Sequence, residues 1–300
     1  MRFDLIDLRL FVAVAEAGSI THGASRVAMA LPSASARIAG MESMLGSALL
    51  ERGRRGVTAT PAGLSLLHHA RGILHQIEAM HGELGEFSLG LRGHVRLMAH
   101  TAVMTEALPD PLAGFLTDHP GIDIALEERE SRDVVRAVIE NRADIGVVSE
   151  AAGLEAGLST LEFLPFHVDR LVLVVPETHA LAVRRRVAFA DVVDETFVGL
   201  RAGSALQGHL DGHAAALGRR LKLRVRMSGF EALCRLVGHG VGLAIMPESA
   251  ARRYRRHTAT VRVRLSDDWA MRHQVICFRA FATLPLPARR LVEHLSAQGR

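Results

Sequence analysis

Three arginines, Arg52, Arg54 and Arg55, stand close together in the run RGRRG, which Gly53 interrupts and Gly56 ends. Guanidinium groups hold phosphate through paired N–H donors, so this run could bind the backbone of a nucleic acid. The glycines favour a tight hairpin between two short strands. The segment therefore predicts a basic wing that lies beside a groove of DNA.

Two short helices precede this hairpin. Ser19 can cap a helix that runs to Val27, because its hydroxyl accepts a hydrogen bond from a free backbone N–H. Pro32 then opens a second helix at the first position, where its missing N–H is not needed. With the turn 28–31 between them, the two predict a helix-turn-helix, whose second helix enters the major groove of DNA.

The second helix has two unlike faces. Its apolar residues recur at helical spacing and predict one buried stripe, made of Ala34, Ile38, Met41 and Leu45. The opposite face carries small residues, which leave room for a major groove: Pro32, Ser35, Ala36, Ala39 and Gly40. Arg37 lies at the edge of the stripe, within reach of phosphate. The alternative is a small helical domain that binds no nucleic acid, with Arg54 and Arg55 as a solvated pair.

Sixteen histidines and two cysteines raise the alternative of an enzyme or a metal site. His209 and His213 could share a helix face, but no glutamate follows as in HExxH. Cys234 and Cys277 have no paired spacing and no histidine partner of a known signature, and no GxSxG elbow occurs. We therefore expect no catalytic residue, no metal and no cofactor. Four more histidines are expected to decorate an exposed helix face: His68, His69, His75 and His81.

The composition fits a multi-domain globular chain. Three hundred residues with 49% hydrophobic content fill two or three compact units. The net charge of +4 is modest for a nucleic-acid binder, so charge alone would not identify DNA as a partner. The charged start of the chain and the lack of an 18-residue apolar run disfavour secretion and membrane spanning. With no disulfide framework, we expect a cytoplasmic location.

A long helix is predicted over 61–87, capped by Thr60 with Pro61 at its first position. Its apolar residues recur at alternating spacings of 4 and 3, which is a heptad seam: Leu66, Ala70, Ile73, Ile77, Met80, Leu84 and Phe87. Glycines at three positions weaken the helix, so we expect a second copy to stabilise it. The alternative is that the helix packs only on its own domain.

Beyond residue 90 the pattern changes to short apolar runs that alternate with helical periodicity, which is typical of α/β architecture. Strands are predicted over 95–99, 122–127, 144–148, 171–175, 196–200, 223–227, 241–246 and 274–278. Helices are predicted over 101–116, 133–141, 205–217, 230–237 and 287–295. Two similar βαβαβ runs indicate two lobes, and the last strand and helix are expected to return to the first lobe.

Ligands of open α/β lobes bind beyond the carboxyl ends of strands, where the starts of helices offer free N–H groups. His100, Thr101 and Ala102 follow the first strand of lobe one, while Arg201, Gly203 and Ser204 follow a strand of lobe two. The two groups can face each other across a cleft. Because a helix N-terminus favours negative charge, we expect an anionic group of the ligand near Thr101.

The N-terminal residues resemble those of the LysR-type transcriptional regulators. The resemblance rests on Leu8, Phe11, Val14, Gly18, Ser19, Ala24, Pro32, Ser35, Ile38, Glu42, Leu45, Gly46, Leu50, Glu51, Arg52, Thr60, Pro61 and Gly63. The C-terminal part resembles the effector domain of the same family at 93–97, 120–122, 144–147, 171–176 and 240–242. The resemblance thus covers nearly the whole chain.

The resemblance implies an N-terminal all-α winged helix-turn-helix, a dimerising linker helix, and an α/β effector part with the two-lobed fold of type 2 periplasmic binding proteins. It also implies that residues at Leu31, Pro32, Ser35 and Ala36 face the bases. The first and last of these are commonly Gln and Arg in the family, so Ser35 is left as the main polar reader here. In the effector part, the Thr101 and Ser204 regions and the stretches at Ser131 and Phe230 contribute to the pocket.

These inferences predict a winged helix-turn-helix over 1–59, a linker helix over 60–90, and an effector domain over 91–300. Lobe one is assigned to about 91–166 and 269–300, and lobe two to about 167–268. The DNA-contacting set is Thr21, His22, Leu31, Pro32, Ser33, Ser35, Ala36, Arg37, Arg52, Arg54 and Arg55. The effector-binding set is His100, Thr101, Ala102, Ser131, Arg201, Gly203, Ser204 and Phe230, and the dimerisation set is Leu66, Ile73, Ile77, Met80 and Leu84.

The predicted function is a bacterial DNA-binding transcription factor that responds to a small anionic effector. Its expected partners are double-stranded DNA with an interrupted palindromic operator, a second copy or more in a dimer or tetramer, and RNA polymerase, with no membrane. The alternative is a soluble solute-binding protein or enzyme whose N-terminal unit only mediates assembly.

Overall fold

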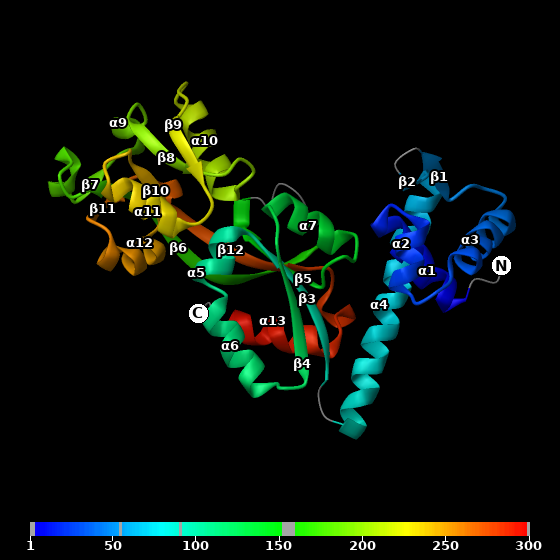
Figure 1. Ribbon diagram of the computed structural model, residues 1–300. Helices are drawn as coiled ribbons and strands as arrows, with labels where there is room; N and C mark the ends of the chain where they lie inside the picture. Colours follow the sequence, from blue (N-terminus) through cyan, green and yellow to red (C-terminus); the bar gives the residue numbers. More distant parts are fainter. Residues whose placement is uncertain (1–3, 54–55, 90–91, 152–159, 299–300) are drawn as a thin grey trace. The chain divides into compact units, whose positions relative to one another are not determined.

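The computed structural model describes residues 4–53, 56–89, 92–151 and 160–298 (Figure 1). It divides into two compact units. The first comprises residues 1–92 with the short segments 140–142 and 282–286, and the second comprises the remainder.

The first unit begins with three helices: α1 (Leu5–Ala17), α2 (Ile20–Arg26) and α3 (Leu31–Leu45). Asp4 caps α1 in a reciprocal capping box with Asp7, and Ser19 caps α2 as predicted. Helix α3 starts at Leu31, one residue earlier than predicted, so Pro32 lies inside its first turn. Strands β1 (Leu50–Gly53) and β2 (Gly56–Ala59) form the predicted antiparallel hairpin.

The core of this unit holds the three helices and the hairpin together. It is built from Leu10, Phe11, Val14, Ala24, Ala34, Ile38, Met41, Leu49 and Leu67. Helix α2 approaches α1 so closely that a Cβ on Gly23 would lie 2.5 Å from the Cα of Val14. Only glycine permits this crossing, which fixes the angle between the first two helices.

The long helix α4 (Pro61–Leu89) follows the hairpin. Thr60 caps it by accepting a hydrogen bond from the Gly63 N–H at 3.0 Å, and its hydroxyl donates to the Ala48 carbonyl at 2.7 Å. Leu67 joins the core, and Arg71 pairs with Glu16 of α1 at 2.8 Å. These contacts dock the start of α4 on α1.

His75 does not decorate an exposed face. Its exposed fraction is only 2%, because it shares a face of α4 with buried Ala79, four residues later. The expectation was therefore wrong for His75, whereas His68, His69 and His81 are exposed.

The second unit is an α/β domain of two lobes. In lobe one, β3 (Gly93–Ala99) pairs in parallel with β4 (Ile122–Glu128) and β5 (Ile145–Ser149). Strand β12 (Met271–Phe278) pairs antiparallel with β5, so the chain returns to lobe one as expected. The helices of this lobe are α5 (Thr101–Glu106), α6 (Pro109–Asp118), α7 (Ser131–Ile139) and α13 (Leu286–Gln298).

In lobe two, the second half of the long strand β6 (Glu162–Pro176) pairs with β10 (Ala244–Pro247) and β11 (Thr260–Leu265), and β11 pairs with β7 (Arg186–Val187). Strands β8 (Thr196–Leu200) and β9 (Lys222–Met227) form a separate parallel pair. The helices are α9 (Phe189–Val192), α10 (Ala205–Ala216), α11 (Phe230–Gly238) and α12 (Glu248–Tyr254).

Several predicted elements differ from the structure. The single helix expected over 101–116 is two helices, α5 ending at Glu106 and α6 beginning at Pro109. Proline has no backbone N–H to continue a helix but fits at the first position of a new one. The strand expected over 171–175 is the end of a 15-residue strand that serves both lobes. Strand β11 and helix α12 were not predicted. Together, β6 and β12 connect the two lobes.

Candidate DNA-reading surface and ligand cleft

Helix α3 presents the surface that was predicted to read DNA. Leu31, Pro32, Ser33 and Ala36 are exposed, and Ser35 is half-buried between them and the core. Thr21 and His22 are exposed on α2. The stripe of Ala34, Ile38 and Met41 is buried, and Leu45 is half-buried. The amphipathic pattern therefore orients α3 as predicted.

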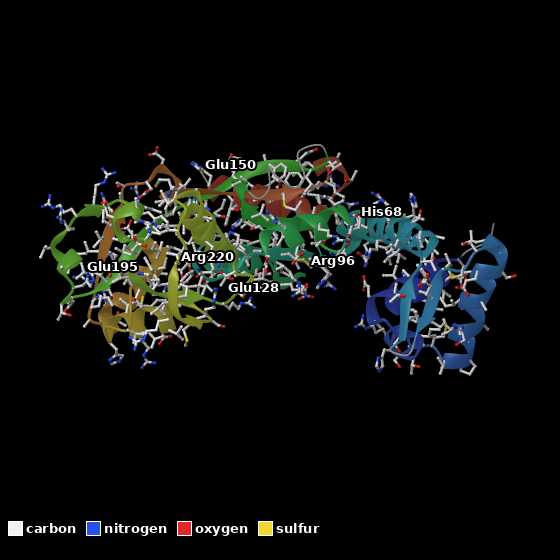
Figure 2. The ribbon with its side chains drawn as sticks, turned by 90° about the horizontal axis from the view of Figure 1, so that it is seen from above. His68, Arg96, Glu128, Glu150, Glu195 and Arg220 are labelled. Carbon is white, nitrogen blue, oxygen red and sulfur yellow. The ribbon has the colours of Figure 1, made fainter. Side chains whose placement is uncertain are left out.

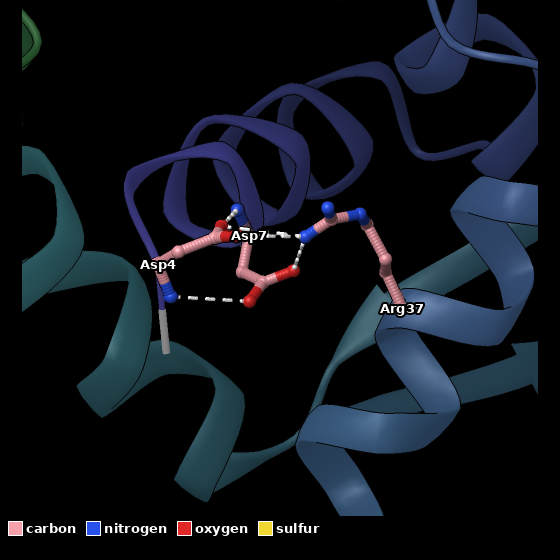
Figure 3. A network of polar contacts seen from close by, with 3 residues as sticks. All are labelled: Asp4, Asp7 and Arg37. Carbon is pink, nitrogen blue, oxygen red and sulfur yellow. Dashed lines mark hydrogen bonds and ion pairs between the residues drawn. The ribbon is translucent and has the colours of Figure 1, made fainter. Parts of the chain in front are cut away.

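Arg37 is held by two carboxylates of the N-terminal segment (Figure 3). Its Nη1 lies 3.1 Å from Asp4 Oδ2 and 2.6 Å from Asp7 Oδ1. The backbone N–H of Asp7 and the guanidinium of Arg37 both lower the pKa of Asp4. Arg37 thus ties α3 to the start of α1, and contact with phosphate would have to compete with this pairing.

The wing is anchored from below by Glu42. Its Oε1 accepts hydrogen bonds from the backbone N–H groups of Leu49 and Leu50, at 2.8 and 3.1 Å, so the end of α3 holds the start of β1. Arg52 is exposed on β1, opposite Val57 of β2. Arg54 and Arg55 lie outside the described residues. Glu42 entered the sequence comparison only as a matching position, and its role in positioning the wing is visible only in the fold.

A cavity of about 330 Å³ lies between the two lobes of the second unit. Its lining includes His100, Ala205, His209, His213, Trp269 and Arg272. The connecting strand β12 contributes the last of these, while His100 follows β3 of lobe one and the ring residues come from lobe two. The cavity therefore lies between the carboxyl end of a lobe-one strand and the start of α10, where ligands of open α/β lobes bind.

A hydrogen-bonded chain through Gln274 and Asp169 joins two lining residues of this cavity, His100 and Arg272. Arg272 pairs with Asp169 of β6, Gln274 Nε2 lies 3.5 Å from Asp169 Oδ1, and Gln274 Oε1 lies 2.8 Å from His100 Nε2. Because the Gln274 amide nitrogen faces Asp169, its oxygen accepts from His100, which leaves His100 Nδ1 as an acceptor. Burial, and then the charge of Arg272, lower the pKa of His100 to about 4. His100 is therefore neutral near pH 7.

Three rings form the wall on the side of lobe two. His213 stacks on Trp269 with ring centroids 4.2 Å apart, and His209 meets both rings edge to face. Burial, then Arg272 and His213, lower the pKa of His209 to about 4, and burial lowers the pKa of His213. The cavity thus offers flat ring faces, neutral imidazole nitrogens and the guanidinium of Arg272, which binds Asp169 through Nε and Nη2.

A carboxylate also lies at the boundary between the lobes. Glu128 of β4, labelled in Figure 2, accepts from the Thr101 hydroxyl at 2.6 Å and from Arg201 of lobe two at 2.9 Å. A second pair joins Arg253 of lobe two to Glu106 of lobe one at 3.3 Å. The position near Thr101 that was expected to hold an anionic ligand therefore faces an anion of the protein itself.

The predicted ligand residues separate into three groups. His100 lines the cavity, and Ser204 is buried next to the lining residue Ala205. Thr101 and Arg201 meet at Glu128, and Gly203, at φ +84, lies against Glu130. Ala102 and Phe230 are packed in the core of lobe two, and Ser131 is buried at the start of α7. For Ala102 and Phe230 the structure indicates a packing role. The sequence analysis did not single out Asp169, Trp269, Arg272 or Gln274. It looked for ligand residues only where predicted strands end, whereas three of these four lie within the strands β6 and β12 that connect the lobes.

Cys234 and Cys277 are both buried free thiols. No group of three or more potential metal ligands occurs in the described residues. Burial raises the pKa of Cys234 to about 11 and that of Cys277 to about 12, so both are poor nucleophiles. Among the same residues, no helix is both long and apolar enough to cross a membrane.

A winged helix-turn-helix joined through a long helix to a two-lobed domain with a central cleft defines the class of ligand-responsive transcriptional regulators. Residues 5–64 match the model of the bacterial regulatory helix-turn-helix proteins of the lysR family, and residues 88–300 match that of the LysR substrate binding domain. The chain belongs to this family and is a LysR-type, DNA-binding transcriptional regulator.

Relatives of this chain carry regulator names. The HTH-type transcriptional regulator CysL of Bacillus subtilis (strain 168) is 26% identical over 82% of this chain and 81% of its own length. A probable hydrogen peroxide-inducible genes activator of Mycobacterium xenopi is 33% identical over 61% of this chain and 95% of its own length.

Solved structures share the fold of the whole chain. A full-length variant of OxyR from Pseudomonas aeruginosa aligns with a TM-score of 0.75 at 18% identity, covering 100% of this chain and 95% of that one. CbnR, a LysR family transcriptional regulator, aligns with a TM-score of 0.65 at 21% identity, covering 99% of this chain and 100% of that one. CbnR has also been solved in complex with its target DNA.

Proposed function

We propose that α3 and the wing bind an operator in double-stranded DNA and that a small molecule in the cleft between the lobes controls this regulator. The observation that supports the proposal is the chain from His100 through Gln274 and Asp169 to Arg272, because its two ends, His100 and Arg272, line an open cavity beside the strands that connect the lobes. A ligand there contacts both lobes and the strands between them, so it can favour one arrangement of the lobes.

We propose further that the effector combines a flat ring with an anionic group. The ring would stack against the wall formed by His209, His213 and Trp269. The anionic group would bind the guanidinium of Arg272, and not the start of α5 near Thr101 as the sequence predicted. Oxidation of a thiol is a poor alternative for this chain, although two mycobacterial relatives are named for hydrogen peroxide, because burial raises the pKa of both cysteines.

A thermal-shift screen of the full chain tests the effector class. Ring carboxylates should raise the melting temperature, whereas the neutral amides of the same compounds should not, because they lack the charge that Arg272 pairs with. The fluorescence of Trp269, the only tryptophan, should change with the same compounds. Amides that stabilise the protein as well as the acids do would remove the anionic group from the proposal.

For DNA, Ser35→Ala should change the preference among operator variants, because base contacts carry the sequence information. Ser43→Ala, at an exposed position near the end of α3, is the matched control.

Replacing Arg54 and Arg55 with alanine should weaken binding to all DNA alike and lower the salt slope by about 2. Gel shifts over a range of salt concentrations measure both effects, and an unchanged slope would remove the two arginines from the phosphate contacts.

The proposal includes a homodimer or tetramer formed through α4, a cytoplasmic location, contact with RNA polymerase, and the absence of an enzymatic activity. The exposed apolar residues Ile73, Met80 and Leu84 support assembly through α4, since they stand in one heptad seam. The raised pKa values of the thiols support a sensor without covalent catalysis.

A further inference from the structure

Lobe two carries a second cavity, open to solvent, of about 450 Å³, where β11 and β7 lie side by side near α12 (Figure 1). Val172 and Val261 contribute apolar surface to it. Six arginines and one glutamate provide its charged lining: Arg184, Arg185, Arg186, Arg252, Arg262, Arg264 and Glu248. We call this cavity the basic groove.

The pairing of the outer strands brings these arginines together. Arg262 and Arg264 lie two residues apart on β11 and so project to one face, while Val263 and Leu265 are buried on the other. The parallel register places Arg264 next to Arg186 of β7, and paired residues share a face of the sheet. The pairing of β11 with β7 therefore places the guanidinium groups of Arg262, Arg264 and Arg186 on the same face of the sheet.

Among the described residues, ion pairs balance little of the charge of the basic groove. Glu248 is its one acidic lining residue and pairs with Arg252 at 2.9 Å. The other five arginines have no ion pair among the described residues, and Arg184, Arg185 and Arg186 are exposed. Like charges this close repel one another, so an anion that enters the groove gains from all of them at once.

We propose that the basic groove binds a compact anion with two or more phosphate groups, at a site separate from the effector cleft. Guanidinium groups hold phosphate oxygens with paired N–H donors, and several of them around one cavity favour several phosphates over one. The volume lies in the range of about 300–1,000 Å³ that is usual for small-molecule sites, which favours a compact ligand over an extended surface. None of the described lining residues is aromatic, so the groove recognises phosphate and offers no ring on which a base could stack.

Calorimetry on the full chain, without divalent cations and at about physiological ionic strength, tests this site with sodium tripolyphosphate as the probe. Arg262→Ser with Arg264→Ser should lower the affinity about tenfold or more, since two charge-assisted contacts are lost. The matched control removes two exposed arginines, Arg220 ahead of β9 and Arg224 within it, by Arg220→Ser with Arg224→Ser, and should retain the affinity (Figure 2 labels Arg220). The wing arginines are intact in both variants, so the comparison isolates the basic groove.

A second variant, Arg184→Ser with Arg185→Ser, changes exposed residues ahead of β7 and tests the groove without touching β11. A nucleoside triphosphate should bind no more tightly than tripolyphosphate, and inorganic phosphate should bind more weakly. No binding of tripolyphosphate, or equal affinity in the groove variants and the control, would overturn the proposal. So would a loss seen only with duplex DNA or an acidic peptide, which would assign the groove to a macromolecule. Gel shifts measure operator binding, and thermal shifts measure ligand binding in the cleft between the lobes. A failure of either proposal can therefore be told apart from a failure of the basic groove to bind tripolyphosphate.

Discussion

The imidazole of His100 makes the stability of the effector domain depend on pH. Burial lowers its pKa from 6.5 to about 4 in the folded protein, so between these values the unfolded chain binds more protons than the folded one. Stability contributed by neutral His100 is therefore present above pH 6.5 and is lost as the pH falls towards 4. From pH 7.5 to 4.5 the loss is about 2–3 kcal/mol.

Urea unfolding of the wild type and of His100→Gln at these two pH values checks the expectation. Glutamine can still donate to Gln274 but cannot be protonated, so the variant should lose less stability on acidification. His94→Gln, at an exposed position, should behave as the wild type. The difference between variants cancels the titration of the carboxylates. An identical pH dependence in all three proteins would contradict a neutral buried His100.

Helix α4 keeps an apolar seam that its own unit leaves uncovered. Ile73, Met80 and Leu84 have exposed fractions of 47%, 48% and 59%, at heptad spacing, whereas Ala70 of the same predicted seam is fully buried. Ile77 is half-buried within one chain, so Ile73 is the cleaner position for a test of the dimer.

Ile73→Arg should dissociate the oligomer, because it places two charges in a seam between copies, at several kcal/mol per dimer. The fold of one chain should persist, since Ile73 is largely exposed there. His68→Arg, on another side of α4, adds the same charge and should leave the mass unchanged. Light scattering gives the mass, and an oligomer that survives Ile73→Arg would assign the seam to contacts within one chain.

In the described part of the effector domain, the ion pairs Arg201–Glu128 and Arg253–Glu106 join lobe two to lobe one. Glu128 is 35% exposed and Arg201 61% exposed, so their pair contributes at most about 1 kcal/mol. Such a small energy still changes the ratio of closed to open cleft by several-fold.

Glu128→Gln removes the charge and keeps the shape, so the cleft should open more often. Acrylamide should then quench the fluorescence of Trp269, which lines the cleft, more efficiently. Glu127→Gln is the neighbouring control, because Glu127 pairs with Arg129 inside lobe one. Equal quenching of both variants would show that the Glu128 pair has no part in closing the lobes.

The sequence by itself determined the local elements of this protein. Ser19 and Pro32 predicted the two short helices, the run from Arg52 to Gly56 predicted the wing, and Thr60 with Pro61 predicted the long helix, because caps, turns and periodicity act within a few residues. The same rules predicted a cleft at the strand ends and placed His100 in it.

The tertiary structure decided which distant residues meet. Arg37 is held by Asp4 and Asp7, about thirty positions away, and His100 is held by Gln274, across a sequence separation of 174 residues. Asp169 and Arg272 meet beside the candidate cleft only because the pairing of β6 with β12 places them opposite each other. Periodicity carries no information on such pairings, since the register depends on how whole strands pack and not on the residues next to each partner.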